Sequence, residues 1–294
     1  MSHAWMPASP CGDACLTHDE ATVGRVRRAL RMAGAVGVLV AAALIVPILA
    51  VLPGRDRVVR TVFRTLLRAL GIRLVVRGDL DGSGRGGLVV SNHISFVDIM
   101  GLSAVRPMRA LAKREIASWP VLGTLVSRAG TVFLDRERLS TLPAAVAELA
   151  DTMRSGSLVT VNPEGTTWCG AASGRFAPAT FQAAIDAGVP VRPVALRYLA
   201  GGRETTRAAF IGPETLIASL RRVVALRDLT LELTVCPEIA PGRAADRGEL
   251  AALAQAAVGS ALGTVTVVPG AAVPAQVRRR TTDVASPEVR AGLS

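Results

Sequence analysis

The chain after residue 71 alternates short apolar runs with segments of helical periodicity. The clearest helical segment is 139–154, where apolar residues recur at steps of three and four. Strands that alternate with helices predict an α/β fold, with a mixed sheet flanked by helices in one domain over 72–263. The runs that predict its strands are 72–76, 88–90, 109–112, 131–134, 158–161, 191–196 and 229–235.

An uncharged stretch at 32–54 precedes this domain. A run of about 20 apolar residues is long enough to cross a bilayer as a helix, and a buried core helix is the alternative. Pro47 offers a place for the helix to break and turn back. Arginines on both flanks leave the positive-inside bias without a direction, so we expect 25–71 to be a re-entrant or interfacial anchor. The flanking arginines are Arg25, Arg27, Arg28 and Arg31 before the stretch, and Arg55, Arg57, Arg60, Arg64 and Arg68 after it.

Residues 57–70 have the pattern of an amphipathic helix, and Gly71 supplies its C-terminal stop. A basic amphipathic helix directly after an apolar anchor suits the membrane interface, with guanidinium groups at lipid phosphates and the apolar side in the acyl boundary. The alternative is a helix that packs on the domain and exposes its arginines to solvent. We expect the interfacial arrangement.

Both ends of the chain are predicted to be disordered, at 1–24 and at 264–294. The four cysteines form no regular framework, which indicates reduced thiols in a cytosol-facing protein. Cys11 and Cys15 could bind a metal together with His3 and His18. No finger pattern follows them, so we expect no metal site.

The net charge of +11 and the pI near 11.2 suit nucleic acid, anionic lipid or phosphorylated substrates. Aromatic residues make up only 3% of the chain, which leaves few platforms for stacking bases, and the mean hydropathy of +0.40 is high for a nucleic-acid-binding protein. We therefore expect membrane lipid as the anionic partner and no nucleic acid. The expected location is the cell membrane, with the domain facing the cytoplasm.

The first candidate for chemistry is His93, which follows the apolar run 88–90, with Asp98 close to the start of the next helix. Active sites of α/β sheets favour such strand ends. Across a strand-to-helix turn the carboxylate can reach the imidazole, fix its tautomer and stabilise the charged ring. Imidazole titrates near neutral pH, so His93 can remove a proton from an acceptor hydroxyl. A purely structural histidine is the alternative.

The second candidate is the turn after the run 158–161, with the sequence Asn-Pro-Glu-Gly-Thr-Thr at 162–167. Glycine lets backbone amides approach an oxyanion closely, and the hydroxyls add donors. Glu164 is suited to orienting an arginine or an acceptor hydroxyl rather than to binding phosphate. An ordinary turn after a strand is the alternative.

Together the two motifs resemble the glycerolipid acyltransferases, typified by bacterial 1-acylglycerol-3-phosphate (lysophosphatidate) acyltransferases. The resemblance covers about residues 72–200 and includes the Gly-Thr-Val-Phe-Leu-Asp-Arg block at 130–136 and the proline-bearing strand 189–194. It implies that His93 and Asp98 form the catalytic pair. It also implies the substrate-binding residues, which are Arg136 for the acceptor phosphate together with Asn92, Lys113, Glu164, Gly165 and Thr166.

The resemblance further implies acyl-CoA or acyl-carrier protein as the donor and co-substrate, with no cofactor and no metal. Two departures from the family pattern put the acceptor in doubt, namely Thr167 in place of a basic residue and Asn162 in place of a hydrophobic one. A lyso-ornithine lipid is a second possible acceptor, and a non-catalytic lipid-binding protein is the rival from another class. An acyl-enzyme on Cys169, or a hydrolase triad with Ser91 or Ser95, are the alternative mechanisms.

Overall fold

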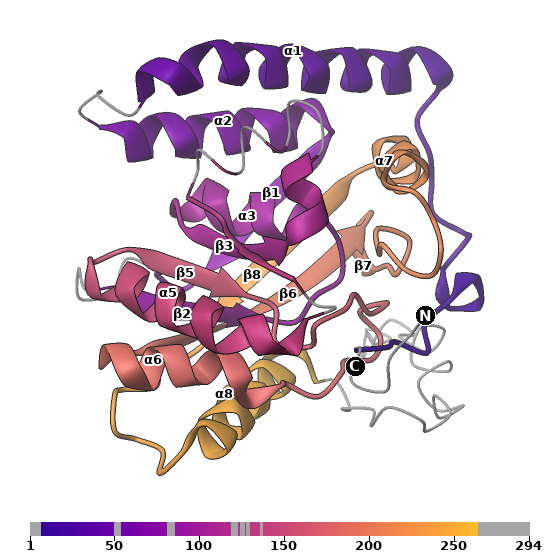
Figure 1. The fold of residues 1–294 in the computed structure, drawn as a ribbon. Coiled ribbons are helices and arrows are strands. Elements are labelled where there is room, and N and C mark those ends of the chain that lie inside the picture. The colour runs from indigo at the N-terminus through magenta and orange to yellow at the C-terminus, as the bar shows by residue number, and fades with distance from the viewer. Residues whose placement is uncertain are drawn as a thin grey trace, which may run out of the picture.

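The computed structural model describes residues 7–49, 54–80, 86–118, 123, 127, 130–135 and 138–263. Its centre is an eight-stranded sheet with the order β1-β8-β6-β2-β5-β3-β4, and β7 pairs with β6 (Figure 1). β6 runs antiparallel to β8, whereas β2 is parallel to both β5 and β6, so the predicted mixed sheet is confirmed. The strands are β1 Ile72–Arg77, β2 Gly87–Ser91, β3 Arg109–Lys113, β4 Val132–Leu134, β5 Leu158–Val161, β6 Val191–Ala200, β7 Arg203–Glu204 and β8 Leu229–Val235.

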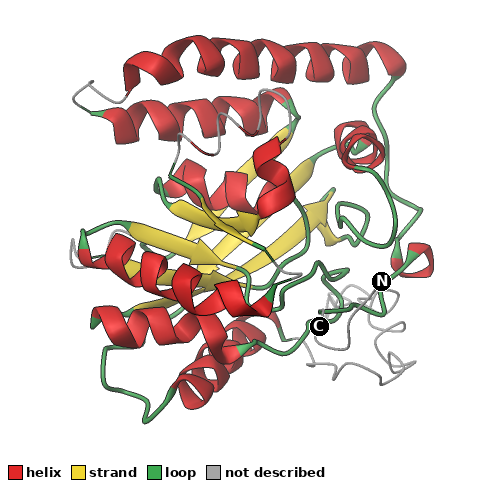
Figure 2. Cartoon of the chain, in the orientation of Figure 1, coloured by secondary structure: helices red, strands yellow, loops and turns green. Residues whose placement is uncertain are grey.

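Helices cover both faces of the sheet (Figure 2). Alternate residues of β2 point to opposite faces, and Val89 packs in one core while Leu88 and Val90 pack in the other. The first core lies beneath α2 and α3, and the second lies beneath α5, α6 and α8. The helices are α1 Arg25–Leu49, α2 Arg55–Ala69, α3 Val97–Val105, α5 Leu142–Arg154, α6 Phe181–Ala187, α7 Leu216–Ala225 and α8 Arg247–Leu262.

All seven predicted strands are present, with ends that differ by a few residues. β7 is additional, and its two exposed residues are too short and too polar to give a sequence signal. The predicted helix 139–154 begins as a 3-10 turn, Leu139–Thr141, and becomes α-helical from Leu142.

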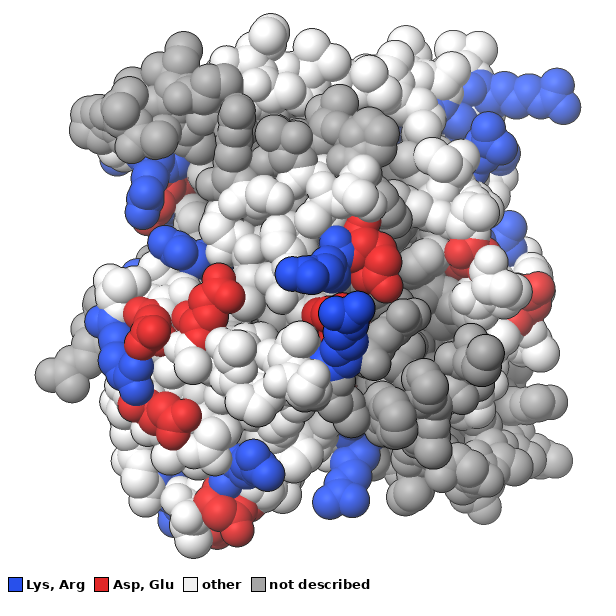
Figure 3. Space-filling view, viewed as in Figure 1, with Lys and Arg blue, Asp and Glu red and all other residues white. Residues whose placement is uncertain are grey.

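Helix α1 forms the outermost layer and lies along α2, which runs back beside it (Figure 1). It begins at Arg25, continues past Pro47 and ends at Leu49, so the expected break at the proline is wrong and the chain turns back later. Its segment Arg25–Ile45 is long and apolar enough to cross a membrane and is a candidate anchor. On the face in Figure 3, the described side chains over α1 are uncharged except near its start. Among its side chains that the structure describes, the large apolar ones that are exposed are Val26, Leu30, Val36, Val40, Leu44 and Ile45.

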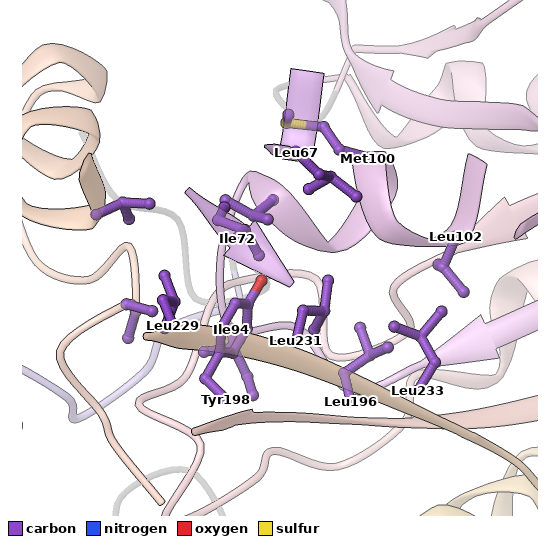
Figure 4. Close-up of a cluster of buried hydrophobic side chains, with 14 of the residues drawn as sticks. Leu67, Ile72, Ile94, Met100, Leu102, Leu196, Tyr198, Leu229, Leu231 and Leu233 are labelled. Atoms are coloured by element: carbon purple, nitrogen blue, oxygen red, sulfur yellow. The ribbon is translucent and has the colours of Figure 1, made fainter. Parts of the chain in front are cut away.

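Helix α2 does not place its apolar side in lipid, as we expected for 57–70. Leu66 and Leu67 are buried in the core cluster that also contains Met100 of α3 (Figure 4). Arg64 is exposed, and its Nε donates to the carbonyl of Ala104 at 2.9 Å. The apolar side therefore faces α3, and the apolar surface that remains open belongs to α1.

Residues 7–24 are not disordered as predicted, because they pack against the domain. Thr17 N donates to Thr206 Oγ1 at 2.9 Å, Val23 N donates to the carbonyl of Ala225 at 2.8 Å, and Cys11 is buried. The sequence prediction failed because these partners lie far away along the chain. The predicted tail at 264–294 lies outside the described residues.

Candidate active site

The site lies where parallel strands end. β2 and β5 pair in parallel, so the residues that follow Ser91 and Val161 emerge at the same edge of the sheet. The first loop carries His93 and the second carries Glu164. The topology thus brings together the two motifs that the sequence singled out.

The carboxylate of Asp98 is fully buried in the first turn of α3 and receives four hydrogen bonds. Its Oδ2 lies 2.9 Å from His93 Nδ1 and accepts from Ile94 N at 2.7 Å and from Ser95 N at 2.9 Å. Its Oδ1 accepts from the hydroxyl of Tyr198 at 2.7 Å. These donors fix the carboxylate and compensate for its removal from water.

The His93 ring is set up to accept a proton. An ionised carboxylate only accepts hydrogen bonds, so the contact with Asp98 places the proton of the neutral ring on Nδ1 and leaves Nε2 as the acceptor. The His93 side chain is 24% exposed, whereas that of Asp98 is 0% exposed. The arrangement is that of a general base with a buried orienting partner.

The second loop holds the backbone of His93 on both sides. His93 N donates to Glu164 Oε2 at 2.6 Å, and the carbonyl of His93 accepts from Trp168 N at 2.7 Å. The other oxygen of Glu164 accepts from Gly174 N at 2.8 Å. Glu164 therefore ties the two loops together, and its side chain is buried.

Burial raises the pKa of Glu164 to about 8, against the opposing effect of the two backbone N–H donors. A carboxyl that is protonated near neutral pH avoids a buried negative charge close to Asp98, whose charge adds to the rise in pKa. The side chain thus links the loops while adding little negative charge to the site.

The side chain of Asn92, which the resemblance implied binds substrate, is turned to the sheet. Its side chain is buried, with Nδ2 donating to the carbonyl of Leu196 at 3.0 Å and Oδ1 accepting from Leu196 N at 2.8 Å. Both ends of the amide are used by β6, so Asn92 fixes the first loop to the sheet. Ser91 makes a comparable link, because its hydroxyl donates to Asn162 Oδ1 at 3.0 Å.

Gly165 and Thr166 lie in the second loop, half-buried. Gly165 has φ +70°, and a Cβ atom there would stand 2.4 Å from Pro7 Cγ, so both the backbone and the N-terminal segment require glycine. The hydroxyl of Thr167 donates to the carbonyl of Phe210. Thr167 and Asn162, the two departures from the family pattern, therefore serve internal hydrogen bonds.

The cationic residues predicted to bind the acceptor are less fully placed. Lys113 ends β3, but its side chain lies outside the described part, and so does the whole of Arg136. β4 ends at Leu134 and is parallel to β3, so its carboxyl end lies at the site edge of the sheet. Arg175, which could replace the missing charge at 167, is exposed.

No pattern in the sequence pointed to Tyr198, the chain's single tyrosine. It lies in the apolar strand β6, where its ring packs in the core with Leu196 and Leu231 (Figure 4). Burial and the nearby charge of Asp98 raise its pKa well above the usual value, so its hydroxyl stays a donor. Only the pairing of strands shows that it reaches Asp98.

The alternative nucleophiles are poorly placed. Cys169 is buried. Its hydrogen bond with Cys11 raises the pKa of the thiol, and burial raises it further. A raised pKa disfavours the thiolate that an acyl-enzyme needs. Ser91 and Ser95 are buried, and within the described residues neither forms a hydrogen bond with His93. The geometry thus favours direct attack by an acceptor hydroxyl.

Comparison with known proteins identifies the family of this chain. A family model described as "Acyltransferase" matches residues 73–197. The lyso-ornithine lipid O-acyltransferase of Pseudomonas aeruginosa is 34% identical over 233 residues, which span 78% of this chain and 85% of the relative. This chain belongs to the acyltransferase family. It is therefore an enzyme that transfers acyl groups.

Two further proteins resemble this acyltransferase. The 1-acyl-sn-glycerol-3-phosphate acyltransferase of Neisseria meningitidis serogroup B is 38% identical over 180 residues, or 61% of this chain and 70% of the relative. The crystal structure of PlsC, the 1-acyl-sn-glycerophosphate acyltransferase of Thermotoga maritima, shares the fold with a TM-score of 0.65 at 18% identity. The matched region covers 81% of this chain and 94% of the Thermotoga chain.

Proposed function

We propose that this acyltransferase moves a fatty acyl group from acyl-CoA or acyl-carrier protein to the hydroxyl of a lysophospholipid-type acceptor. The acceptor is 1-acylglycerol-3-phosphate, and the product is phosphatidate. The observation that carries the proposal is the 2.9 Å contact between Nδ1 of the partly exposed His93 ring and the buried carboxylate of Asp98. No cofactor or metal takes part in the transfer.

The reaction needs two proton transfers, one from the acceptor hydroxyl to His93 and one from His93 to the leaving thiolate. Nε2 of His93 takes the proton of the acceptor hydroxyl as the oxygen attacks the thioester carbonyl. Asp98 stabilises the positive charge on the ring during this step. Collapse of the tetrahedral intermediate breaks the carbon–sulfur bond, and the departing thiolate receives the proton from Nε2. Arg136 holds the acceptor phosphate, and Lys113 adds positive charge beside it.

Two acceptors have support among the relatives. The Neisseria relative, named for 1-acyl-sn-glycerol-3-phosphate, has the higher identity. The Pseudomonas relative, named for lyso-ornithine lipid, aligns over a larger share of both chains. The hydroxyl of Thr167 donates to the carbonyl of Phe210, and the side chain carries no charge. Recognition of a phosphate therefore depends on Arg136 and Lys113.

Both the donor and the membrane impose an orientation. The exposed apolar side of α1 supplies the contact with lipid. Acyl thioesters are cytosolic, so the site faces the cytoplasm while α1 remains at the membrane. The partners are therefore membrane lipid and the acyl-CoA or acyl-carrier protein that delivers the acyl group.

Purified full-length protein in mixed micelles tests the proposal with a labelled acyl donor. We expect labelled phosphatidate from 1-acylglycerol-3-phosphate, with His93→Ala as the inactive control, and a comparison of acyl-CoA with acyl-carrier protein identifies the donor. Product formed only from lyso-ornithine lipid would replace the proposed acceptor. Binding of both lipids without transfer from either donor would instead identify a lipid-binding protein.

A further inference from the structure

Three of the four cysteines meet beside the second loop, although the sequence places two of them more than 150 positions from the third. The sulfur atoms of Cys11, Cys15 and Cys169 all lie within 4.8 Å of one another. Cys11 is 6% exposed and Cys169 is 3% exposed, while Cys15 is half-buried. Cys169 N also donates to Cys11 Sγ at 3.3 Å.

Contacts that do not involve the sulfurs hold this cluster together. Thr206 Oγ1 donates to the carbonyl of Cys15 at 2.7 Å and accepts from Thr17 N at 2.9 Å. Cys15 N donates to the carbonyl of Gly12 at 2.8 Å in the 3-10 turn Asp13–Cys15. The backbone therefore presents Cys11 and Cys15 to Cys169 before any bond forms between the sulfurs.

We propose that Cys11, Cys15 and Cys169 bind one Zn²⁺ ion, which fastens the N-terminal segment to the second loop of the active site. Zinc binds thiolate sulfur at about 2.3 Å, which sets tetrahedral sulfurs roughly 3.8 Å apart. A small contraction of the observed cluster meets that spacing. Binding converts three thiols into three thiolates and releases three protons to solvent.

The cluster suits a metal better than a disulfide. A disulfide joins two sulfurs at about 2.05 Å and leaves the third without a role, whereas zinc uses all three. Because Cys15 is half-buried, we assign the fourth position of the tetrahedron to a solvent molecule. Soft thiolate ligands select zinc over the magnesium and calcium ions that prefer oxygen.

The ion is structural rather than part of the transfer. Cys169 follows Trp168 in the chain, and the backbone N–H of Trp168 donates to the carbonyl of His93. Zinc at Cys169 therefore restrains the loop that positions His93 without contact with the reacting atoms. Its removal should lower thermal stability and acyl transfer together, whereas the preference among acceptors should stay the same.

The test uses full-length protein, fully reduced, equilibrated with Zn²⁺ and passed over a desalting column before metal analysis. We expect about one zinc per chain, a higher melting temperature with zinc, and loss of both in Cys11→Ser, Cys15→Ser and Cys169→Ser. The matched control is Cys236→Ser, because Cys236 is buried in the other core, beside the carbonyl groups of Thr234 and Ala257. Zinc retained equally by the cluster variants would mean an adventitious ion only and would overturn the site.

A measurement on the unsubstituted protein covers the case in which a variant does not fold. Co²⁺ in place of Zn²⁺ should give the strong visible absorption of tetrahedral thiolate-bound cobalt, and Zn²⁺ should displace it. Absence of that absorption, with four free thiols counted, would reject the metal site and leave the cysteines as packing residues. A disulfide within the cluster after purification in air, with no metal retained by the reduced protein, would replace the metal with a redox bond.

Discussion

The hydroxyl of Tyr198 donates to the oxygen of Asp98 that His93 does not use, at 2.7 Å. Tyr198 thus acts on the reaction through the carboxylate and never needs to touch a substrate. Together with the two backbone N–H donors, it holds Asp98 in the orientation that faces the imidazole.

Tyr198→Phe should keep the fold and reduce turnover. The ring still packs in the core, but the carboxylate loses a hydrogen bond worth about 1.5 to 3 kcal/mol for a charged partner. Because Tyr198 acts through Asp98 and not on a substrate, its loss should lower kcat and leave the KM values for donor and acceptor nearly unchanged. An unchanged kcat would limit Tyr198 to packing.

His93→Ala should reduce acyl transfer by roughly 100-fold to 10,000-fold while it leaves the melting temperature nearly unchanged, because the ring is partly exposed and acts in proton transfer. Asp98→Asn should reduce both activity and stability. Its amide would point an N–H toward donors that now converge on the carboxylate. Kinetics on purified variants, with calorimetry, separate the two effects. Near-normal turnover in either variant would defeat the proposed mechanism.

Arg136→Ala should raise the KM for the acceptor far more than the KM for the donor. Arg136→Lys should recover only part of the loss, because lysine cannot form the two parallel hydrogen bonds of a guanidinium with phosphate. Arg138→Ala is the matched control, since Arg138 is exposed and lies 3.8 Å from the carboxylate of Asp135. An equal rise in both KM values would show that Arg136 has been given the wrong role.

Glu164 should make the protein less stable as the pH rises. Its pKa is about 8 when folded and near 4.5 when unfolded, so between these values the folded state binds one proton more than the unfolded state. The stabilisation is complete below pH 4.5 and is lost as the pH rises to 8. Glu164→Gln should be less stable at low pH yet flatter across this window. Denaturant titrations measure this dependence, with the exposed Glu148→Gln as the control. An unchanged slope in Glu164→Gln would refute it.

Both ends of the helical pair α1–α2 should stay on the cytoplasmic side. Arg31, in the second turn of α1, is buried against the domain, with Nη1 donating to the carbonyls of Val224 and Leu226 at 2.8 Å each. That docking is incompatible with moving the start of α1 across the bilayer. Asp19→Cys and Ser260→Cys, both at exposed positions and each compared with the unsubstituted protein, should resist a membrane-impermeant reagent until cells are lysed. Labelling of residue 19 alone in intact cells would demonstrate a crossing.

The sequence was informative where the determining pattern is local. The apolar runs predicted the strands, and the spacing of His93 and Asp98 predicted a pair at a strand end because both lie in one short turn. Partners that are distant in the chain escaped prediction. Tyr198 reaches Asp98 only through strand pairing, and Cys11 reaches Cys169 only because residues 7–24 pack on the domain.

The apolar side of α2 was predicted wrongly for a related reason. Its periodicity is the same whether that side faces lipid or a protein core, and only the position of α3 decides between them. The same limit applies to Asn92, whose amide could bind a substrate or, as found, the backbone of Leu196.

The direct join between the two loops also bears on how this architecture can be modified. His93 and Glu164 are 71 positions apart, yet the backbone N–H of His93 donates directly to the carboxylate of Glu164. A longer loop raises the entropic cost of closing that loop only slightly. Insertions between β3 and α5 should therefore leave the His93–Asp98 geometry intact. Chimaeras that exchange 114–141 with a relative's segment could therefore alter headgroup choice on an unchanged proton-transfer centre.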